Sequence, residues 1–205
     1  MVWRRVGSLV VGRVPVTALV SYYRVLRTSK QAQGPGRSID TRKVWLITAA
    51  CSLLGVKNPT VLDLGCGDCR YASVVETACG LGMYVGVDAK PNCQGRNVVR
   101  TDLEVWDSPF VGVFDLVLAL DILEHLTNYG HALDVARKAI KPSGLLLVST
   151  IAVPMDDVQD AIERDPEHVH LYTRGLLKRA LRRHGFEATH TWQDHEILLT
   201  IAKPI

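Results

Sequence analysis

The first 39 residues of this 205-residue chain contain no aspartate or glutamate, and no apolar run is long enough to predict a membrane span. The longest apolar stretch, residues 6–20, is interrupted by Arg13 and Pro15, so we expect no transmembrane helix. We also expect no secretory signal, which favours a cytoplasmic protein. Hydrophobic residues make up 47% of the chain and charged residues 22%, as in one globular domain with a sizeable core.

The scarcity of acids near the N-terminus makes the charge uneven along the chain. Seven of the 24 basic residues precede Asp40, which leaves 17 basic residues against 21 acidic ones. Residues 40–205 therefore carry a net charge of about −4. The body of the chain does not have the charge of a basic nucleic-acid-binding protein.

The acid-free segment is predicted to be an N-terminal extension, residues 1–37, that ends at the helix breaker Gly34-Pro35-Gly36. Apolar residues at helical spacing predict an amphipathic helix over about residues 16–29. This basic helix fits four roles: a lid over a substrate, attachment to an anionic membrane surface, an organelle import signal, or packing on the domain with a solvated basic face. Residues 38–205 are predicted to form the single domain.

Cysteine is also scarce, and the odd number of five suggests a reducing compartment. Cys66 and Cys69 have the C-x-x-C spacing of redox and metal sites. No second pair stands at zinc-site spacing, and the glycines give this loop another role. We therefore expect neither a metal nor a redox role for the pair.

Glycines follow a short apolar run in the middle of the chain. Val61–Leu64 reads as a buried strand, Gly65 and Gly67 come next, and residues 70–78 read as a helix. Glycine permits a positive φ at such a corner and has no Cβ to keep a ligand away. The free N–H groups at the start of the following helix face the space above the strand. Both a nucleotide-type cradle and an ordinary strand-to-helix turn fit this pattern.

Strands and helices alternate around this loop. Further strands are predicted near residues 83–88, 97–100, 114–120 and 145–150, and helices near residues 40–55, 129–140 and 173–185. Phe114–Leu120 is almost entirely apolar, as in a strand buried on both faces of a parallel sheet. Two β-like stretches, residues 188–192 and 197–202, lie too close together for a crossover and predict an antiparallel hairpin. The predicted fold class is α/β: a doubly wound, mostly parallel sheet with an antiparallel terminal strand.

Asp88 ends the second predicted strand, one helix and one strand after Gly67. At that distance a carboxylate can accept both hydroxyl protons of a ribose held over the first loop. Together with the glycine loop, this position favours nucleoside binding over a chance acid at a strand end.

Six motifs are arranged in a characteristic order: Val61–Gly67, Val87-Asp88, Thr101-Asp102-Leu103, Phe114–Val117, Leu123-Glu124-His125-Leu126 and Gly185-Phe186. In these motifs, residues 40–205 resemble the class I S-adenosylmethionine-dependent methyltransferases. The Leu-Glu-His-Leu segment is most similar to the branch that acts on small molecules, which includes quinone-biosynthesis and natural-product enzymes. The resemblance implies a Rossmann-like sheet of seven strands.

The resemblance also implies roles for individual residues toward the cofactor, S-adenosyl-L-methionine. The methionine end would be held by Asp63 and the backbone of Gly65, Cys66 and Gly67. The ribose would be held by Asp88 with Ala89, the adenine by Asp102 with Leu103, and the sulfonium would be bordered by Leu120 and Asp121. One departure from the family pattern is Cys69, which stands where the loop normally has its third glycine.

Catalysis of methyl transfer depends mainly on aligning the attacking atom, the methyl carbon and the sulfur. A base is needed only if the acceptor must lose a proton. The candidates for this base are His125, His168 and Asp121, together with His170. Residues 167–170 could also bind a metal through alternate side chains of a strand, but no further ligands lie nearby in sequence, and we predict no metal site. We expect residues 151–172 to form part of the acceptor pocket.

The sequence therefore predicts a methyltransferase that moves a methyl group to an oxygen, nitrogen or carbon atom of a small organic acceptor. Two alternatives stay open: a methyltransferase acting on RNA or protein, and a module that binds S-adenosylmethionine without catalysis. The basic N-terminus and the helix near residues 173–184 could contact RNA or an anionic membrane surface, although a solvated basic face is the simpler interpretation. Nothing in the sequence indicates an oligomeric state.

Overall fold

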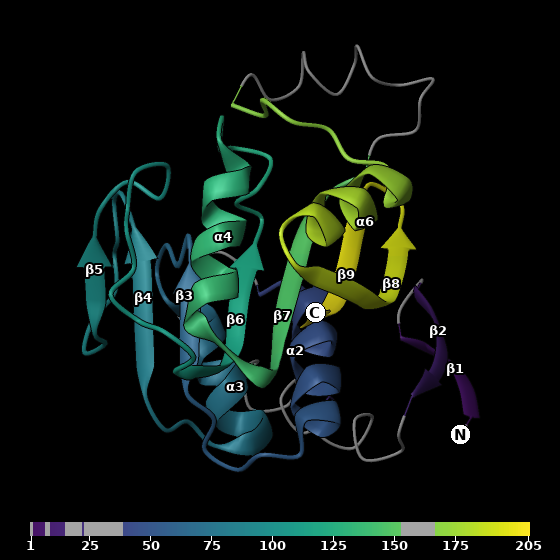
Figure 1. The fold of residues 1–205 in the computed structure, drawn as a ribbon. Helices are drawn as coiled ribbons and strands as arrows, with labels where there is room; N and C mark the ends of the chain where they lie inside the picture. The colour runs from purple at the N-terminus through teal and green to yellow at the C-terminus, as the bar shows by residue number, and fades with distance from the viewer. Residues whose placement is uncertain (1, 7–8, 15–21, 23–38, 153–166) are drawn as a thin grey trace.

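The computed structural model describes residues 2–6, 9–14, 22, 39–152 and 167–205. Within these residues, a seven-stranded sheet runs in the order β5-β4-β3-β6-β7-β9-β8 (Figure 1). Its strands are β3 (Val61–Leu64), β4 (Tyr84–Asp88), β5 (Val98–Arg100), β6 (Phe114–Leu120), β7 (Ile140–Ile151), β8 (Phe186–Asp194) and β9 (Ile197–Pro204). The helices are α2 (Thr41–Leu54), α3 (Arg70–Cys79), α4 (Tyr129–Ala139) and α6 (Arg174–Arg183).

The strand directions confirm the predicted fold class. Neighbouring strands from β5 to β7 are parallel, whereas β9 is antiparallel to both β7 and β8. The chain moves outward from β3 to β4 and β5, and then returns to β6 on the other side of β3. In open α/β sheets a ligand binds outside the carboxyl ends of the strands where the order reverses in this way. Here that point lies between β3 and β6.

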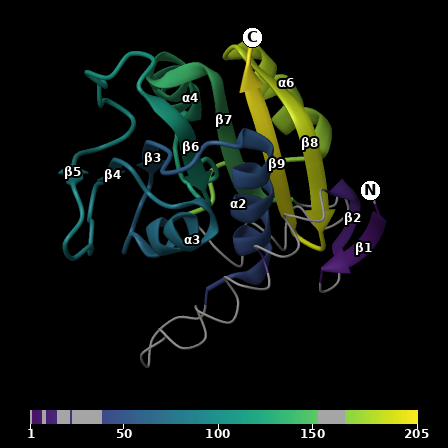
Figure 2. The ribbon, with the colours of Figure 1, turned by 90° about the horizontal axis from the view of Figure 1, so that it is seen from below.

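Helices cover both faces of the sheet. α2 and α3 lie on one face, and α4 and α6 lie on the other (Figures 1 and 2). Successive side chains of a strand point to opposite faces of a sheet. In β6, Leu116 and Leu118 therefore pack in the core shared with α2 and α3. Val117 and Ala119 pack in the core shared with α4. This two-sided burial explains why the sequence of β6 is apolar almost throughout.

Local sequence signals set the helix boundaries. Asp40 caps α2, because its side chain accepts a hydrogen bond from the Arg42 N–H at 2.9 Å. Thr173 caps α6 through the Leu176 N–H at 3.2 Å. α2 ends at Gly55, whose φ of 67° lies in the left-handed region that glycine adopts freely.

The N-terminal segment contains two strands that the sequence did not predict. β1 (Val2–Val6) pairs antiparallel with β2 (Leu9–Val14), and β2 lies beside β8 (Figure 2). Adjacent arginines at positions 4 and 5 obscure the alternation that normally marks a strand. The predicted helix over residues 16–29 falls outside the described residues apart from Tyr22, so the division near residue 37 stays a prediction. Among the described residues, none of the helices combines the length and apolarity that crossing a bilayer requires.

Gly55→Ala is expected to destabilise the protein through the backbone alone. A Cβ at this position would have no heavy atom within 4 Å, so the cost is that of holding alanine at a φ of 67°, about 1 kcal/mol. Urea unfolding should show this loss, and Gly55→Asn should lose less because asparagine tolerates the left-handed region. An unchanged unfolding free energy in Gly55→Ala would contradict the role of this C-cap.

Candidate active site

A cavity of about 640 Å³ opens at the carboxyl ends of β3 and β6, where the strand order reverses. It is bordered by the start of α2, the glycine loop after β3, the segment after β4 and the end of β6. Small-molecule sites typically occupy about 300–1,000 Å³. Six residues predicted from sequence are in its wall: Asp63, Gly65, Cys66, Gly67, Leu120 and Asp121.

The glycine loop exposes its main chain to this cavity. Gly65 and Gly67 have positive φ values of 73° and 53°. A Cβ on Gly65 would lie 2.7 Å from the side chain of Ile122, so glycine is needed where the loop passes the segment after β6. A Cβ on Gly67 would meet no heavy atom within 4 Å, which leaves room for a ligand to approach the backbone.

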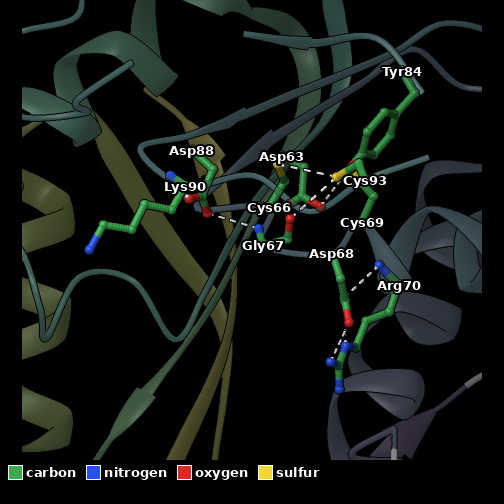
Figure 3. Close-up of a disulfide and its surroundings, with 10 residues drawn as sticks. All are labelled: Asp63, Cys66, Gly67, Asp68, Cys69, Arg70, Tyr84, Asp88, Lys90 and Cys93. Carbon is green, nitrogen blue, oxygen red and sulfur yellow. Dashed lines mark hydrogen bonds and ion pairs between the residues drawn. A yellow bond between two sulfur atoms is a disulfide. The ribbon is translucent and has the colours of Figure 1, made fainter. Parts of the chain in front are cut away.

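Asp88 lies against the glycine loop, and its predicted contact with a ribose remains a prediction. Its Oδ2 accepts a hydrogen bond from the Gly67 N–H at 2.8 Å, and its Oδ1 accepts one from the Lys90 N–H at 2.7 Å. Figure 3 shows the bond between Asp88 and Gly67. Gly67 and Lys90 line the cavity, so the Asp88 carboxylate is bonded directly to the cavity wall.

Asp63 is a buried carboxyl group in the same wall. The residue is 2% exposed, and the Tyr84 hydroxyl donates a hydrogen bond to Asp63 Oδ2 at 2.7 Å. Burial raises the pKa of Asp63 to about 7; the hydrogen bond from Tyr84 opposes this rise, and the nearby negative charge of Asp88 adds to it. A positively charged ligand would favour the ionised form of this carboxyl group.

Asp121 follows β6 with a φ of 53° and borders the cavity. Its carboxylate already has partners: Oδ2 pairs with the Lys43 ammonium, and Oδ1 accepts a hydrogen bond from Ser149 Oγ at 2.7 Å. Lys43 is only 6% exposed, so α2 brings a buried cation to the cavity. Sequence reasoning missed Lys43, because nothing in the sequence of α2 distinguishes it from a solvated lysine.

Four residues predicted to contact the adenosine do not line the cavity: Asp88, Ala89, Asp102 and Leu103. Leu103 is buried, and Asp102 Oδ1 accepts a hydrogen bond from the Glu104 N–H at 2.9 Å. The Ala89 carbonyl accepts one from Arg100 Nε at 3.3 Å. Their contacts with a ligand remain predictions. The predicted acceptor segment, residues 151–172, falls largely outside the described residues.

The fold brings His125 and His168 together, although they are far apart in sequence. Their ring centroids are 4.7 Å apart, and His125 Nδ1 lies 3.2 Å from the Glu167 carbonyl oxygen. One ligand atom from each histidine and one from Glu124 all lie within 4.8 Å of one another. Neither histidine lines the cavity. His125 lies in a turn that precedes α4, which begins at Tyr129.

Glu124, which lies beside these two histidines, is a buried carboxyl group with a raised pKa. It is 1% exposed, and Thr150 Oγ1 donates a hydrogen bond to its Oε2 at 2.8 Å. Burial raises the pKa of Glu124 to about 7. A carboxyl group with this pKa can accept or donate a proton near neutral pH. The Leu-Glu-His-Leu motif contains Glu124, but its burial depends on the folded structure.

The cysteines near the glycine loop make a contact that the sequence did not predict. Cys69 forms a disulfide bond with Cys93, whereas Cys66 is a free thiol 3.9 Å from Cys93 Sγ (Figure 3). The C-x-x-C spacing concerns Cys66 and Cys69, which are not bonded to each other. The segment after β4 instead returns Cys93 to the loop, with 5.5 Å between the Cα atoms of the bonded pair, a separation suited to a disulfide.

α6 has one apolar face and one basic face. Leu177, Ala180 and Leu181 are buried. Its exposed basic side chains are Arg174, Lys178, Arg179, Arg182 and Arg183. The amphipathic sequence of this helix therefore follows from packing on one side and solvent on the other.

Comparison with known proteins identifies related sequences. The family model described as "Methyltransferase domain" matches residues 38–191. A tRNA U34 carboxymethyltransferase of Pseudomonas putida (strain W619) is 29% identical over 175 residues, covering 74% of this chain and 53% of that enzyme. A ubiquinone biosynthesis O-methyltransferase of Pelagibacter ubique (strain HTCC1062) is 28% identical over 107 residues, covering 47% and 43%. The chain thus spans about half the length of the curated relatives it matches.

A solved structure shares the fold at low sequence identity. It is Burkholderia thailandensis 1,6-didemethyltoxoflavin-N1-methyltransferase with bound 1,6-didemethyltoxoflavin and S-adenosylhomocysteine. The TM-score is 0.60 and the identity 18%, over 96% of this chain and 94% of that one. At this identity the likeness establishes the fold.

Tyr84→Phe is expected to raise the pKa of Asp63 above its value of about 7. The substitution removes the hydroxyl that stabilises the carboxylate and leaves the burial in place. Carboxyl carbon shifts of labelled aspartate, followed by NMR across a pH titration, measure this change. Tyr71→Phe is the matched control, since Tyr71 also lines the cavity and should leave the Asp63 titration nearly unchanged. A lower pKa of Asp63 in Tyr84→Phe would refute the stabilising hydrogen bond.

Proposed function

The chain belongs to the methyltransferase-domain family, as a class I S-adenosylmethionine-dependent methyltransferase, and from this premise we propose that it methylates an oxygen, nitrogen or carbon atom of a small organic acceptor. The observation that carries the proposal is the cavity at the strand-order reversal, whose wall joins the glycine loop to the end of β6. One matched relative is a ubiquinone biosynthesis O-methyltransferase, and one structural neighbour holds 1,6-didemethyltoxoflavin. Both names are consistent with a small acceptor.

The charge of the cavity wall supports binding of S-adenosylmethionine. We assign Asp63 to the ammonium of the methionine end, because this positive charge offsets the cost of ionising a buried carboxyl group. We assign the open main chain at Gly67 to the methionine carboxylate, since no side chain blocks its approach. Both oxygens of Asp88 accept backbone hydrogen bonds, and each has a further lone pair for a ribose hydroxyl.

S-adenosylmethionine supplies a methyl group that is already bound to a good leaving group. The task of the chain is then to hold the acceptor atom in line with the methyl carbon and the sulfur. Leu120 and Asp121 border the cavity at the end of β6, and the ion pair with Lys43 fixes the orientation of the Asp121 carboxylate. His125 and His168 lie outside the cavity wall, so they would serve as bases only for an acceptor that extends from the cavity to Glu124.

RNA is a second candidate acceptor. The exposed basic face of α6 and the similarity to a tRNA U34 carboxymethyltransferase favour it. The negative net charge of residues 40–205 opposes it, because phosphate contacts would have to come from α6 and the N-terminal segment against the charge of the rest of the domain.

Asp88→Ala is expected to weaken S-adenosylhomocysteine binding about 10- to 100-fold, because the ribose and the Gly67 N–H both lose an acceptor. Isothermal titration calorimetry measures the affinity. Asp107→Ala, which removes an exposed acid outside the cavity wall, is the matched control and should bind normally. Full affinity in Asp88→Ala, or no binding by the unaltered protein, would reject the cofactor assignment.

Transfer of a radiolabelled methyl group should occur to a member of a panel of phenols, hydroquinones and amines, with little dependence on salt. Total tRNA is tested in parallel, because labelling that falls steeply between about 50 and 200 mM salt indicates an RNA acceptor. In that case, replacing the basic residues of α6 with serine should lower the labelling of tRNA. Cofactor binding without transfer to any acceptor would argue against an enzyme.

A further inference from the structure

Cys69 adopts a backbone conformation that normally requires glycine. Its φ is 58° and its ψ is 21°, in the left-handed region, and it is the N-cap of α3 without a capping side-chain hydrogen bond. A residue with a Cβ is less stable by about 1–2 kcal/mol in this region. Something other than local preference must therefore hold Cys69 in place.

The disulfide bond to Cys93 supplies this restraint. Cys93 belongs to the connection between β4 and β5, and the bond ties that connection to the start of α3 (Figure 3). The neighbouring Asn92 donates its N–H to the Gly67 carbonyl at 2.9 Å, and both Asn92 and Gly67 line the cavity. The disulfide thus fixes two parts of the cavity wall against each other.

We propose that the Cys69–Cys93 bond is a redox-controlled restraint that sets the affinity of the glycine loop for the adenosyl cofactor. The proposal rests on the function assigned to this cavity. With the bond formed, Cys69 is held in the left-handed conformation and the loop is ready to bind. With the bond broken, Cys69 can leave that conformation, and the population of the binding-competent loop falls.

The chemistry of the switch is a two-electron exchange. A dithiol reductant attacks one sulfur, the Cys69–Cys93 bond breaks, and both residues become thiols while the reductant becomes a disulfide. The half-buried Cys93 is the more accessible sulfur, because Cys69 is 6% exposed. Cys66 lies close to Cys93, but burial, together with the charge of Asp63, raises its pKa to about 12. Cys66 is therefore a thiol rather than an attacking thiolate, and the pairing of Cys69 with Cys93 persists.

The test compares S-adenosylhomocysteine affinity with and without a dithiol reductant in four proteins. Reduction should weaken binding by the unaltered protein about 5- to 30-fold. Cys93→Ser should bind as weakly as the reduced protein under both conditions. Adding Cys69→Gly to Cys93→Ser should restore tight binding under both conditions, because glycine adopts the left-handed conformation without a restraint. Cys79→Ser, which alters a thiol outside this loop, should keep the full response to reductant.

A redox-independent affinity in the unaltered protein, or weak binding in the glycine double variant, would overturn the proposal.

Hydrogen exchange of the loop amides over residues 65–72 provides a readout that does not need the cofactor. Exchange should accelerate on reduction in the unaltered protein and stay slow in the glycine double variant. If no protein binds S-adenosylhomocysteine but exchange follows this pattern, the proposed function fails and the restraint stands. If S-adenosylhomocysteine binds tightly and the exchange rates do not change on reduction, the proposed restraint is wrong and the proposed function is kept.

Discussion

The register of β3 between its two parallel neighbours is the constraint on which the site depends. Leu64 is paired with Val87 of β4 and with Ala119 of β6, so the next residues of the three strands emerge at one edge. Gly65 turns at that edge, where its N–H donates to the Val87 carbonyl at 2.8 Å. The glycine loop and the end of β6 border the same cavity, and Asp88 lies directly behind its wall, because parallel strands end on the same side of a sheet.

Several acidic residues lie near this edge, and their charges affect the pKa values of buried groups in the site. Burial raises the pKa of Asp63, and the charges of Asp88 and Asp68 raise it further. The pKa of the Cys66 thiol is raised mainly by burial and by Asp63, and to a smaller extent by Asp88 and Asp68. Ionising Asp63 here costs free energy, because burial and the neighbouring acids both disfavour its charged form. A cofactor with two positive groups relieves that cost, so the electrostatic strain of the free site favours binding of a cation.

In the described residues, the titratable group around Glu124 is separate from the cavity wall. Glu124, His125 and His168 form a titratable group next to the turn that leads to α4, and none of the three belongs to the cavity wall. Asp121, another candidate base, does line the cavity, and it is held by Lys43 and Ser149. This separation agrees with a displacement in which alignment dominates and a base is needed only for some acceptors.

The sequence by itself determined what local spacing encodes. The apolar run of β6, the caps at Asp40 and Gly55 and the glycine corner could all be predicted, because each depends on periodicity or on the φ preference of one residue. The separation of Gly67 from Asp88 also indicated their contact, since one helix and one strand fix that geometry. Only the tertiary structure decided which distant groups meet: Lys43 with Asp121, Tyr84 with Asp63, and Cys93 with Cys69. These pairs depend on how helices and connections pack against the sheet, and sequence spacing carries no record of that packing.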